Sequence, residues 1–73
     1  DDYIIDALTT LDEFNSYFLT DFSDDVETIG GYLVNKFERV PLKGEIIVIS
    51  NFLFKILSAD SRTIKRVKLS KKI

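Results

Sequence analysis

Four residue types are absent from this 73-residue chain: cysteine, histidine, methionine and tryptophan. Without cysteine, the chain has no disulfide framework, no thiolate metal site and no cysteine nucleophile. Without histidine, it lacks the commonest general base and the commonest metal ligand. Most catalytic schemes therefore fail for this sequence. The chain also has no apolar run approaching the roughly 20 residues that cross a bilayer as a helix.

What is present is typical of a small globular protein. Hydrophobic residues make up 45% of the chain and charged residues 30%, a balance that argues against disorder. A chain of this length supplies one domain, residues 1–73, and buries only about 60% of its unfolded surface. We therefore expect modest stability.

Charge is unevenly distributed along the chain. Nine of the 12 acidic residues lie in residues 1–27, whereas all ten lysines and arginines lie in residues 28–73. Two explanations are open: the basic half binds an acidic partner, or the two halves face each other within one fold.

The first quarter of the chain predicts a strand followed by a helix. Residues 3–8, YIIDAL, are rich in the β-branched and aromatic residues of strands. Residues 10–13, TLDE, fit a capping box, in which the Thr10 hydroxyl and the Glu13 carboxylate bond each other's backbone N–H. An apolar stripe at helical spacing then predicts a helix of about two turns: Leu11, Phe14 and Phe18. Ser and Asp in residues 19–25 predict a loop, with Phe22 as an apolar anchor.

A second helix is predicted over residues 29–39. Thr28 is a suitable N-cap, and apolar residues recur at helical spacing: Ile29, Leu33, Phe37 and Val40. We expect Pro41 to end this helix, because proline disfavours helical backbone at the preceding residue.

Gly30 and Gly31 fall in the first turn of this second helix. Each glycine costs about 1 kcal/mol of helix stability relative to alanine, so the pair needs a reason. One is the close approach of another backbone segment. The other is an anion bound by exposed N–H groups at the helix start. A glycine pair without a preceding strand-turn signature is a weak phosphate motif, which favours packing.

The rest of the chain predicts three antiparallel strands over residues 45–50, 52–59 and 63–70, joined by short turns. In the middle strand, Phe52, Phe54 and Ile56 share one face and form the better core candidate. Val67 and Leu69 share a face that Ile64 does not. Either a β-bulge lies near Lys65 and Arg66, or Ile64 packs outward.

The first of these three strands is apolar on both faces, Ile46 and Val48 opposite Ile47 and Ile49. Two short helices cover only one side of a four-stranded sheet. The residues on the uncovered side, Ile47 and Ile49, are therefore expected to form an interface. We expect a homodimer, the commonest arrangement, or a neighbouring domain to cover it.

The element order predicts an α+β fold, β-α-α-β-β-β, with two helices packed on one face of a mainly antiparallel four-stranded sheet. Three segments resemble the transporter-associated domain of the CorC/HlyC family: YIIDALTTLDEFN, TIGGYLVNKFERVPLKGE and FKILSADSRTIKRVKL. The first is similar to that family's opening strand, cap and first helix, and the second to its Gly-Gly helix and Arg-x-Pro break. The third is similar to its closing hairpin. The chain departs from the family at two turns, with Ser50-Asn51 and Asp60-Ser61 in place of glycine-containing turns.

The resemblance implies a fragment of a longer protein: the C-terminal module of a CBS-domain-containing magnesium and cobalt efflux or haemolysin-like membrane protein. Such a module would lie at the cytoplasmic face of the bacterial inner membrane, beside the CBS domains of the same chain. It would modulate transport of divalent cations (Mg or Co) and would not be an enzyme. The alternative is a nucleotide- or flavin-binding domain, because the family's fold is similar to a subdomain of flavin oxidases.

One carboxylate group is dense enough to consider as a metal site: Asp24, Asp25 and Glu27. Its oxygens would suit a weakly bound divalent cation, Mg or Ca. A solvated loop before a helix explains the same residues, because acids favour helix N-termini. No other cofactor is expected. Nucleic-acid binding is not expected, because no aromatic residue lies among the basic residues of the last strand.

Overall fold

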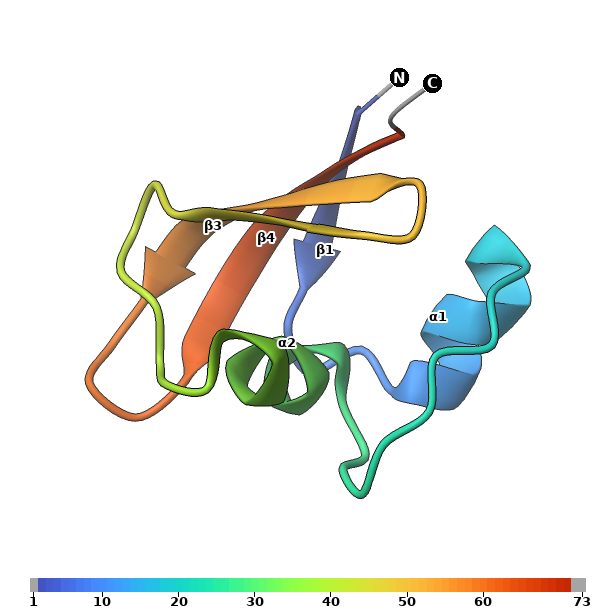
Figure 1. Cartoon of the computed structure of the whole chain (residues 1–73), viewed down its shortest axis with the longest axis horizontal. Helices are drawn as coiled ribbons and strands as arrows, with labels where there is room; N and C mark the ends of the chain where they lie inside the picture. The colour runs from blue at the N-terminus through green and yellow to red at the C-terminus, as the bar shows by residue number, and fades with distance from the viewer. Residues whose placement is uncertain (1, 72–73) are drawn as a thin grey trace.

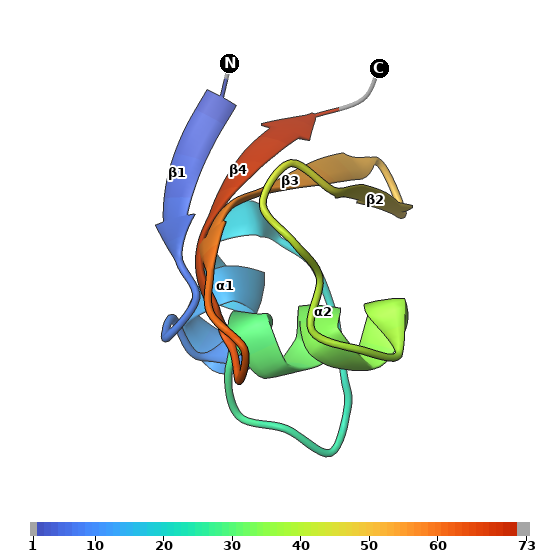
Figure 2. The same cartoon turned by 90° about the vertical axis from the view of Figure 1, so that its left-hand side faces the viewer.

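The computed structural model describes residues 2–71 and confirms the predicted element order. Its elements are β1 (Asp2–Asp6), α1 (Leu11–Phe18), α2 (Ile29–Phe37), β2 (Ile46–Ile49), β3 (Phe52–Ala59) and β4 (Ile64–Lys71). The strands form one antiparallel sheet in the order β1-β4-β3-β2, so the first and last strands pair and β1 and β2 are its edges. Both helices lie under the same face of the sheet, and the other face has no helix over it (Figure 1). Figure 2 shows the four strands in order, with β1 and β2 on opposite sides.

The predicted capping box begins α1. The Glu13 N–H donates to the Thr10 Oγ1 at 3.1 Å, and the Thr10 N–H donates to the Glu13 Oε1 at 3.1 Å. These bonds satisfy donors that a helix start otherwise leaves free. The helix ends at Phe18, because the next residue, Leu19, adopts a left-handed backbone with φ 57°.

The second helix is capped by Thr28, whose Oγ1 accepts the Gly31 N–H at 3.1 Å. It ends at Phe37, two residues earlier than predicted, because Glu38 adopts a left-handed backbone with φ 63°. The predicted role of Pro41 as the terminator is therefore wrong. Pro41 is instead buried beyond the end of the helix.

Aromatic rings fill the space between the helices and the sheet. Phe14 is 1% exposed and lies within 6.3 Å, centroid to centroid, of four other phenylalanine rings: Phe18, Phe22, Phe52 and Phe54. The predicted loop anchor Phe22 is confirmed, since its ring also stacks on Tyr32 at 5.0 Å. The buried apolar side chains are Ala7, Leu11, Phe14, Ile29, Tyr32, Leu33, Phe52, Phe54, Ile56, Ile64, Val67 and Leu69. One cluster thus joins every layer of the domain.

The predicted irregularity in the last strand is a β-bulge. Ser58 pairs with Arg66 and Ala59 pairs with Ile64, which leaves Lys65 as the extra residue on β4. The bulge turns Ile64 to the same face as Val67, and Ile64 is only 2% exposed. A second register shift, between Ile56 and Ser58, lies beside it.

The packing explanation for Gly30 is confirmed. A Cβ at Gly30 would lie 2.8 Å from the Ala7 Cβ, closer than real Cβ atoms approach, and 3.0 Å from the Ala7 carbonyl oxygen. The Gly30 N–H donates to that same oxygen at 2.9 Å. The start of α2 therefore lies directly against the end of β1. Gly31 is less crowded, with its Cβ position 3.2 Å from the Val26 Cβ.

Candidate functional site

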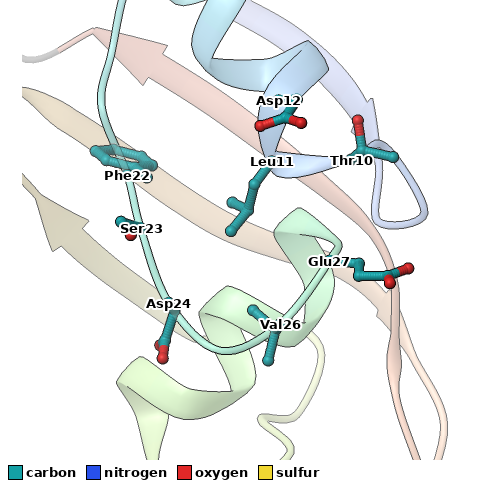
Figure 3. A pocket seen from close by; sticks show the side chains of 8 residues that line it. All are labelled: Thr10, Leu11, Asp12, Phe22, Ser23, Asp24, Val26 and Glu27. Carbon is teal, nitrogen blue, oxygen red and sulfur yellow. The ribbon is translucent and has the colours of Figure 1, made fainter.

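The loop before α2 carries the predicted metal ligands Asp24, Asp25 and Glu27 and borders an open hollow. The hollow, of about 440 Å³, lies between this loop and the start of α1. It is lined by Thr10, Leu11, Asp12, Phe22, Ser23, Asp24, Val26 and Glu27. Figure 3 shows that Asp24 and Glu27 lie on either side of Val26 and point away from each other. The carboxylates that line the hollow therefore do not converge on one point.

Local hydrogen bonds explain where Asp24 points. Its Oδ1 accepts the Asp25 N–H at 2.7 Å, and its Oδ2 accepts from the Asn35 Nδ2 at 3.3 Å. These two bonds hold the pKa of Asp24 below its ordinary value, and the bond from the Asp25 backbone contributes more than the bond from Asn35. Within residues 2–71, no three Asp, Glu, His or Cys side chains lie together as metal ligands. The structure thus does not assemble Asp24, Asp25 and Glu27 into the predicted three-carboxylate site.

The Gly-Gly helix start offers no free donors to an anion at these two residues. The Gly30 N–H is bonded to the Ala7 carbonyl and the Gly31 N–H to the Thr28 hydroxyl. An anion at the helix start would have to displace both bonds, which argues against a phosphate cradle.

The uncovered face of the sheet, called the outer face below, carries a mixed apolar and basic surface. On β2, Ile46 is 52% exposed and Val48 is 45% exposed. Their neighbours Ile47 and Ile49 pack against the buried core instead. The predicted interface pair, Ile47 and Ile49, is therefore on the wrong face: the outward apolar residues of β2 are Ile46 and Val48.

The signal that assigns these faces was present in the sequence. A two-residue turn at Ser50-Asn51 makes Ile49 pair with Phe52 and Ile47 with Phe54. Directly paired residues share a face, so the phenylalanine face takes Ile47 and Ile49 with it.

Two lysines lie side by side at the centre of the outer face. Lys55 on β3 is paired in register with Lys68 on β4. The Lys68 Nζ lies 3.3 Å from the Asp2 Oδ2 on β1, and Ser70 also donates to Asp2, at 2.7 Å. The Ser70 and Lys68 hydrogen bonds lower the pKa of Asp2. The outer face thus runs from apolar residues on β2, through lysines on β3 and β4, to acidic residues on β1.

A clamp that the sequence did not reveal fixes the turn before β2. Arg39 bonds both carboxylate oxygens of Glu45, and the Leu42 N–H donates to the Glu45 Oε2 at 2.6 Å. These bonds, led by the one from Arg39, lower the pKa of Glu45 to about 2. An arginine and a glutamate six positions apart, with a proline between them, give no sequence pattern that predicts such a clamp.

Among residues 2–71, no helix is both long enough and apolar enough to cross a membrane.

Comparisons with known proteins give consistent results. The family model described as CorC_HlyC, transporter associated domain, matches residues 1–72. The chain is 42% identical over 69 residues to the magnesium and cobalt efflux protein CorC of Pasteurella multocida, and 46% identical over 66 residues to that of Buchnera aphidicola subsp. Acyrthosiphon pisum. These matches cover 93% and 89% of this chain but only 23% of each relative. The chain therefore spans about a quarter of the length of these curated relatives.

A solved structure shares the fold. The putative Mg2+ and Co2+ transporter (CorC) associated region from Neisseria meningitidis MC58 superposes with a TM-score of 0.93 at 26% identity. The superposition covers 97% of this chain and 89% of that one. The whole-length family match, the identity to the CorC relatives and the shared fold agree, and the chain belongs to the CorC_HlyC transporter-associated domain family.

Proposed function

We propose that this domain is a non-catalytic regulatory module of a longer bacterial membrane protein, and that it modulates transport of Mg²⁺ or Co²⁺ by that protein. The observation that carries the proposal is the family match over residues 1–72. The relatives that share this segment are named magnesium and cobalt efflux proteins, and it forms about a quarter of their length. The remaining three quarters of such a protein would hold the transport pathway, at the bacterial inner membrane with this domain on its cytoplasmic side.

The outer face of the sheet supplies a surface for this role. A regulatory domain needs a stable fold and a contact with its neighbour, but no nucleophile or base. Ile46, Val48 and Lys55 lie exposed on the side that the helices leave uncovered. A neighbouring module of the same chain, such as a CBS-domain pair, would cover part of this side and so couple the domain to the transport pathway.

The alternative is a nucleotide- or flavin-binding domain. It would need a phosphate cradle, and the N–H groups of Gly30 and Gly31 are already bonded within the domain. We therefore expect no saturable binding when FAD, ATP or Mg²⁺ is titrated against the purified domain and followed by calorimetry. Binding at micromolar concentration would favour the alternative.

A domain exchange tests the regulatory role. In the Pasteurella multocida relative, the matching segment is deleted in one variant and replaced by this chain in another. Export of Mg²⁺ and cobalt tolerance are then measured in cells. We expect the deletion to change the export rate at a given internal Mg²⁺ concentration and the exchange to restore it. Export that is the same with and without the segment would refute the regulatory role.

Substitutions in this chain, placed in the same exchanged protein, test the contact surface. Lys55→Glu reverses a charge on the outer face, and Lys43→Glu makes the same change in the exposed turn before β2. We expect the first to disturb regulation and the second to leave it intact. Equal effects from both would argue against the outer face as the contact.

A further inference from the structure

The two edges of the sheet differ in charge. The edge strand β2 consists of Ile46, Ile47, Val48 and Ile49, with no charged residue, no proline and no bulge. An edge with these properties is a template for another strand, because its outward backbone groups are unpaired and nothing repels a partner.

The register identifies which backbone groups are free. The Ile56 N–H donates to the Glu45 carbonyl, and alternation along the strand then directs the N–H and C=O groups of Ile47 and Ile49 toward β3. Ile46 and Val48 therefore direct their N–H and C=O groups to the open edge. Their side chains lie on the outer face, 52% and 45% exposed.

We propose that two copies of this domain associate through β2, in antiparallel register about a two-fold axis at Ile47. Ile46 of each copy then pairs with Val48 of the other, and each such pair exchanges two backbone hydrogen bonds. The two four-stranded sheets become one continuous sheet. On its outer face, Ile46 and Val48 of the two copies form a single apolar stripe.

Charge favours this pairing, since no two charged residues oppose each other along it. The residue next to β2 is Glu45, which faces Ile49 of the second copy in this register. Its carboxylate is already bound by Arg39. Lys55 pairs with Ile46 within each copy, and in this register an apolar strand of the second copy lies beyond Ile46, so Lys55 opposes no charged residue across the contact.

The opposite edge does not allow the equivalent contact. The Ala7 N–H donates to the Lys65 carbonyl, so Asp2, Ile4 and Asp6 direct their backbone groups to the open side of β1. Pairing β1 with itself about Ile4 would place Asp2 opposite Asp6 at both ends. Like charges directly opposite each other are destabilising. The carboxylates thus leave β2 as the one edge of the described sheet that is suited to self-association.

The short strand limits the strength of the contact. Four residues bury much less than the roughly 1,200 Å² of the smallest stable interfaces, so we expect a dissociation constant on the order of 0.1 to 1 mM. The proposal is independent of the transport role, because it concerns only the isolated domain.

Amide hydrogen exchange tests the register directly. Between about 0.05 and 1 mM protein, exchange at Ile46 and Val48 should slow about two- to threefold, because dimerisation occupies their N–H groups. Ile47 and Ile49 serve as internal controls, since their N–H groups are bonded to β3 in either state. Exchange at Ile46 and Val48 that does not depend on concentration would overturn the proposal.

Sedimentation equilibrium tests the surface with matched variants. Ile46→Lys with Val48→Lys places lysine opposite lysine in both pairs, and should leave a monomer at 1 mM. Ile4→Lys with Leu8→Lys makes the same charge change at exposed positions beside the β1 edge and should associate as the native domain does. Association that survives the β2 change, or a native domain that is monomeric at 1 mM, would overturn the proposal. If the β2 variant does not fold, the exchange measurement on the native domain still decides.

Discussion

The two edge strands of this sheet are similar in length, five residues in β1 and four in β2, but differ in charge. On β1, Asp2 and Asp6 alternate with apolar residues, and both carboxylates lie on the outer side with Ile4. On β2 all four residues are apolar. The same core thus supports one edge whose charges repel a partner and one edge with no such defence. This contrast shows that the charge of an edge strand can vary while the core beneath it stays the same.

The edges also differ in how they are attached to the helices. β1 is joined to α2 by backbone contact, with the Ala7 carbonyl accepting the Gly30 N–H at 2.9 Å. β2 is reached from α2 through a turn that side chains hold, the Arg39–Glu45 ion pair. Backbone contact depends on shape, whereas the ion pair depends on protonation. Changes in packing should therefore disturb β1 first, and changes in pH should disturb β2.

The largest expected effect separates the two faces of β2. Ile47→Lys should lower the free energy of unfolding by about 2 to 3 kcal/mol, because the side chain packs against the core. Val48→Lys, on the outer face, should change it by less than about 0.5 kcal/mol. Urea unfolding of both variants measures the difference. A loss from Val48→Lys as large as that from Ile47→Lys would mean that both faces of β2 are buried.

A smaller effect is expected where β1 meets α2. Gly30→Ala should cost about 1 to 2 kcal/mol, because the new Cβ collides with Ala7 and outweighs the gain in helix propensity. Gly31→Ala is the matched control. Its Cβ contacts Val26 more gently, so the gain and the strain should nearly cancel. Thermal unfolding compares the two, and amide exchange at Ile5 should quicken only in the first. Equal stability of the two variants would show that α2 is free to move away from β1.

The smallest effect concerns pH. The Arg39 and Leu42 bonds hold the pKa of Glu45 at about 2 in the folded state, against an ordinary value of 4.5. Because the folded pKa is the lower one, the stabilisation is present above pH 4.5 and is lost as the pH falls toward 2. Glu45→Gln should therefore be less stable than the native domain at pH 6, with the two converging near pH 2.

The same titration can compare the edges. Asp2 at the β1 edge also has a lowered pKa, so Asp2→Asn is the matched change there. We expect a smaller difference from the native domain than Glu45→Gln gives. Urea midpoints at several pH values measure both. A Glu45→Gln difference that persists unchanged at pH 2 would show that the carboxylate charge is not what holds the turn.

Much of the fold was predictable because its signals are local. The capping box at Thr10 and the strand boundaries at Phe52 and Ala59 each follow from residues within a few positions of one another. The β-bulge beside Lys65 was one of the two alternatives that the local pattern indicates. The order of the elements followed from the same local patterns, and the family resemblance agreed with it. The end of α2 differs from the prediction because nothing in the sequence marks Glu38 as left-handed.

The candidate surfaces were harder to predict because they depend on contacts between distant residues. Asp24, Asp25 and Glu27 lie within four positions of one another, yet Asn35 on α2 helps to fix where Asp24 points. The face of β2 is an exception, because the short turn at Ser50-Asn51 is a local signal that pairs Ile49 with Phe52 and so turns Ile47 and Ile49 inward. The pairing of β1 with β4 joins residues 68 positions apart, and no short-range pattern reports it.

That pairing has a mechanical consequence. Asp2 and Ser70 are partners in register, so the chain enters and leaves the domain at the same end of two neighbouring antiparallel strands (Figure 1). A force that pulls the two ends apart loads their hydrogen bonds one pair at a time, like a zipper, rather than all together in shear. The domain should yield to such a pull at low force, beginning with β1, whatever the stability of its aromatic core.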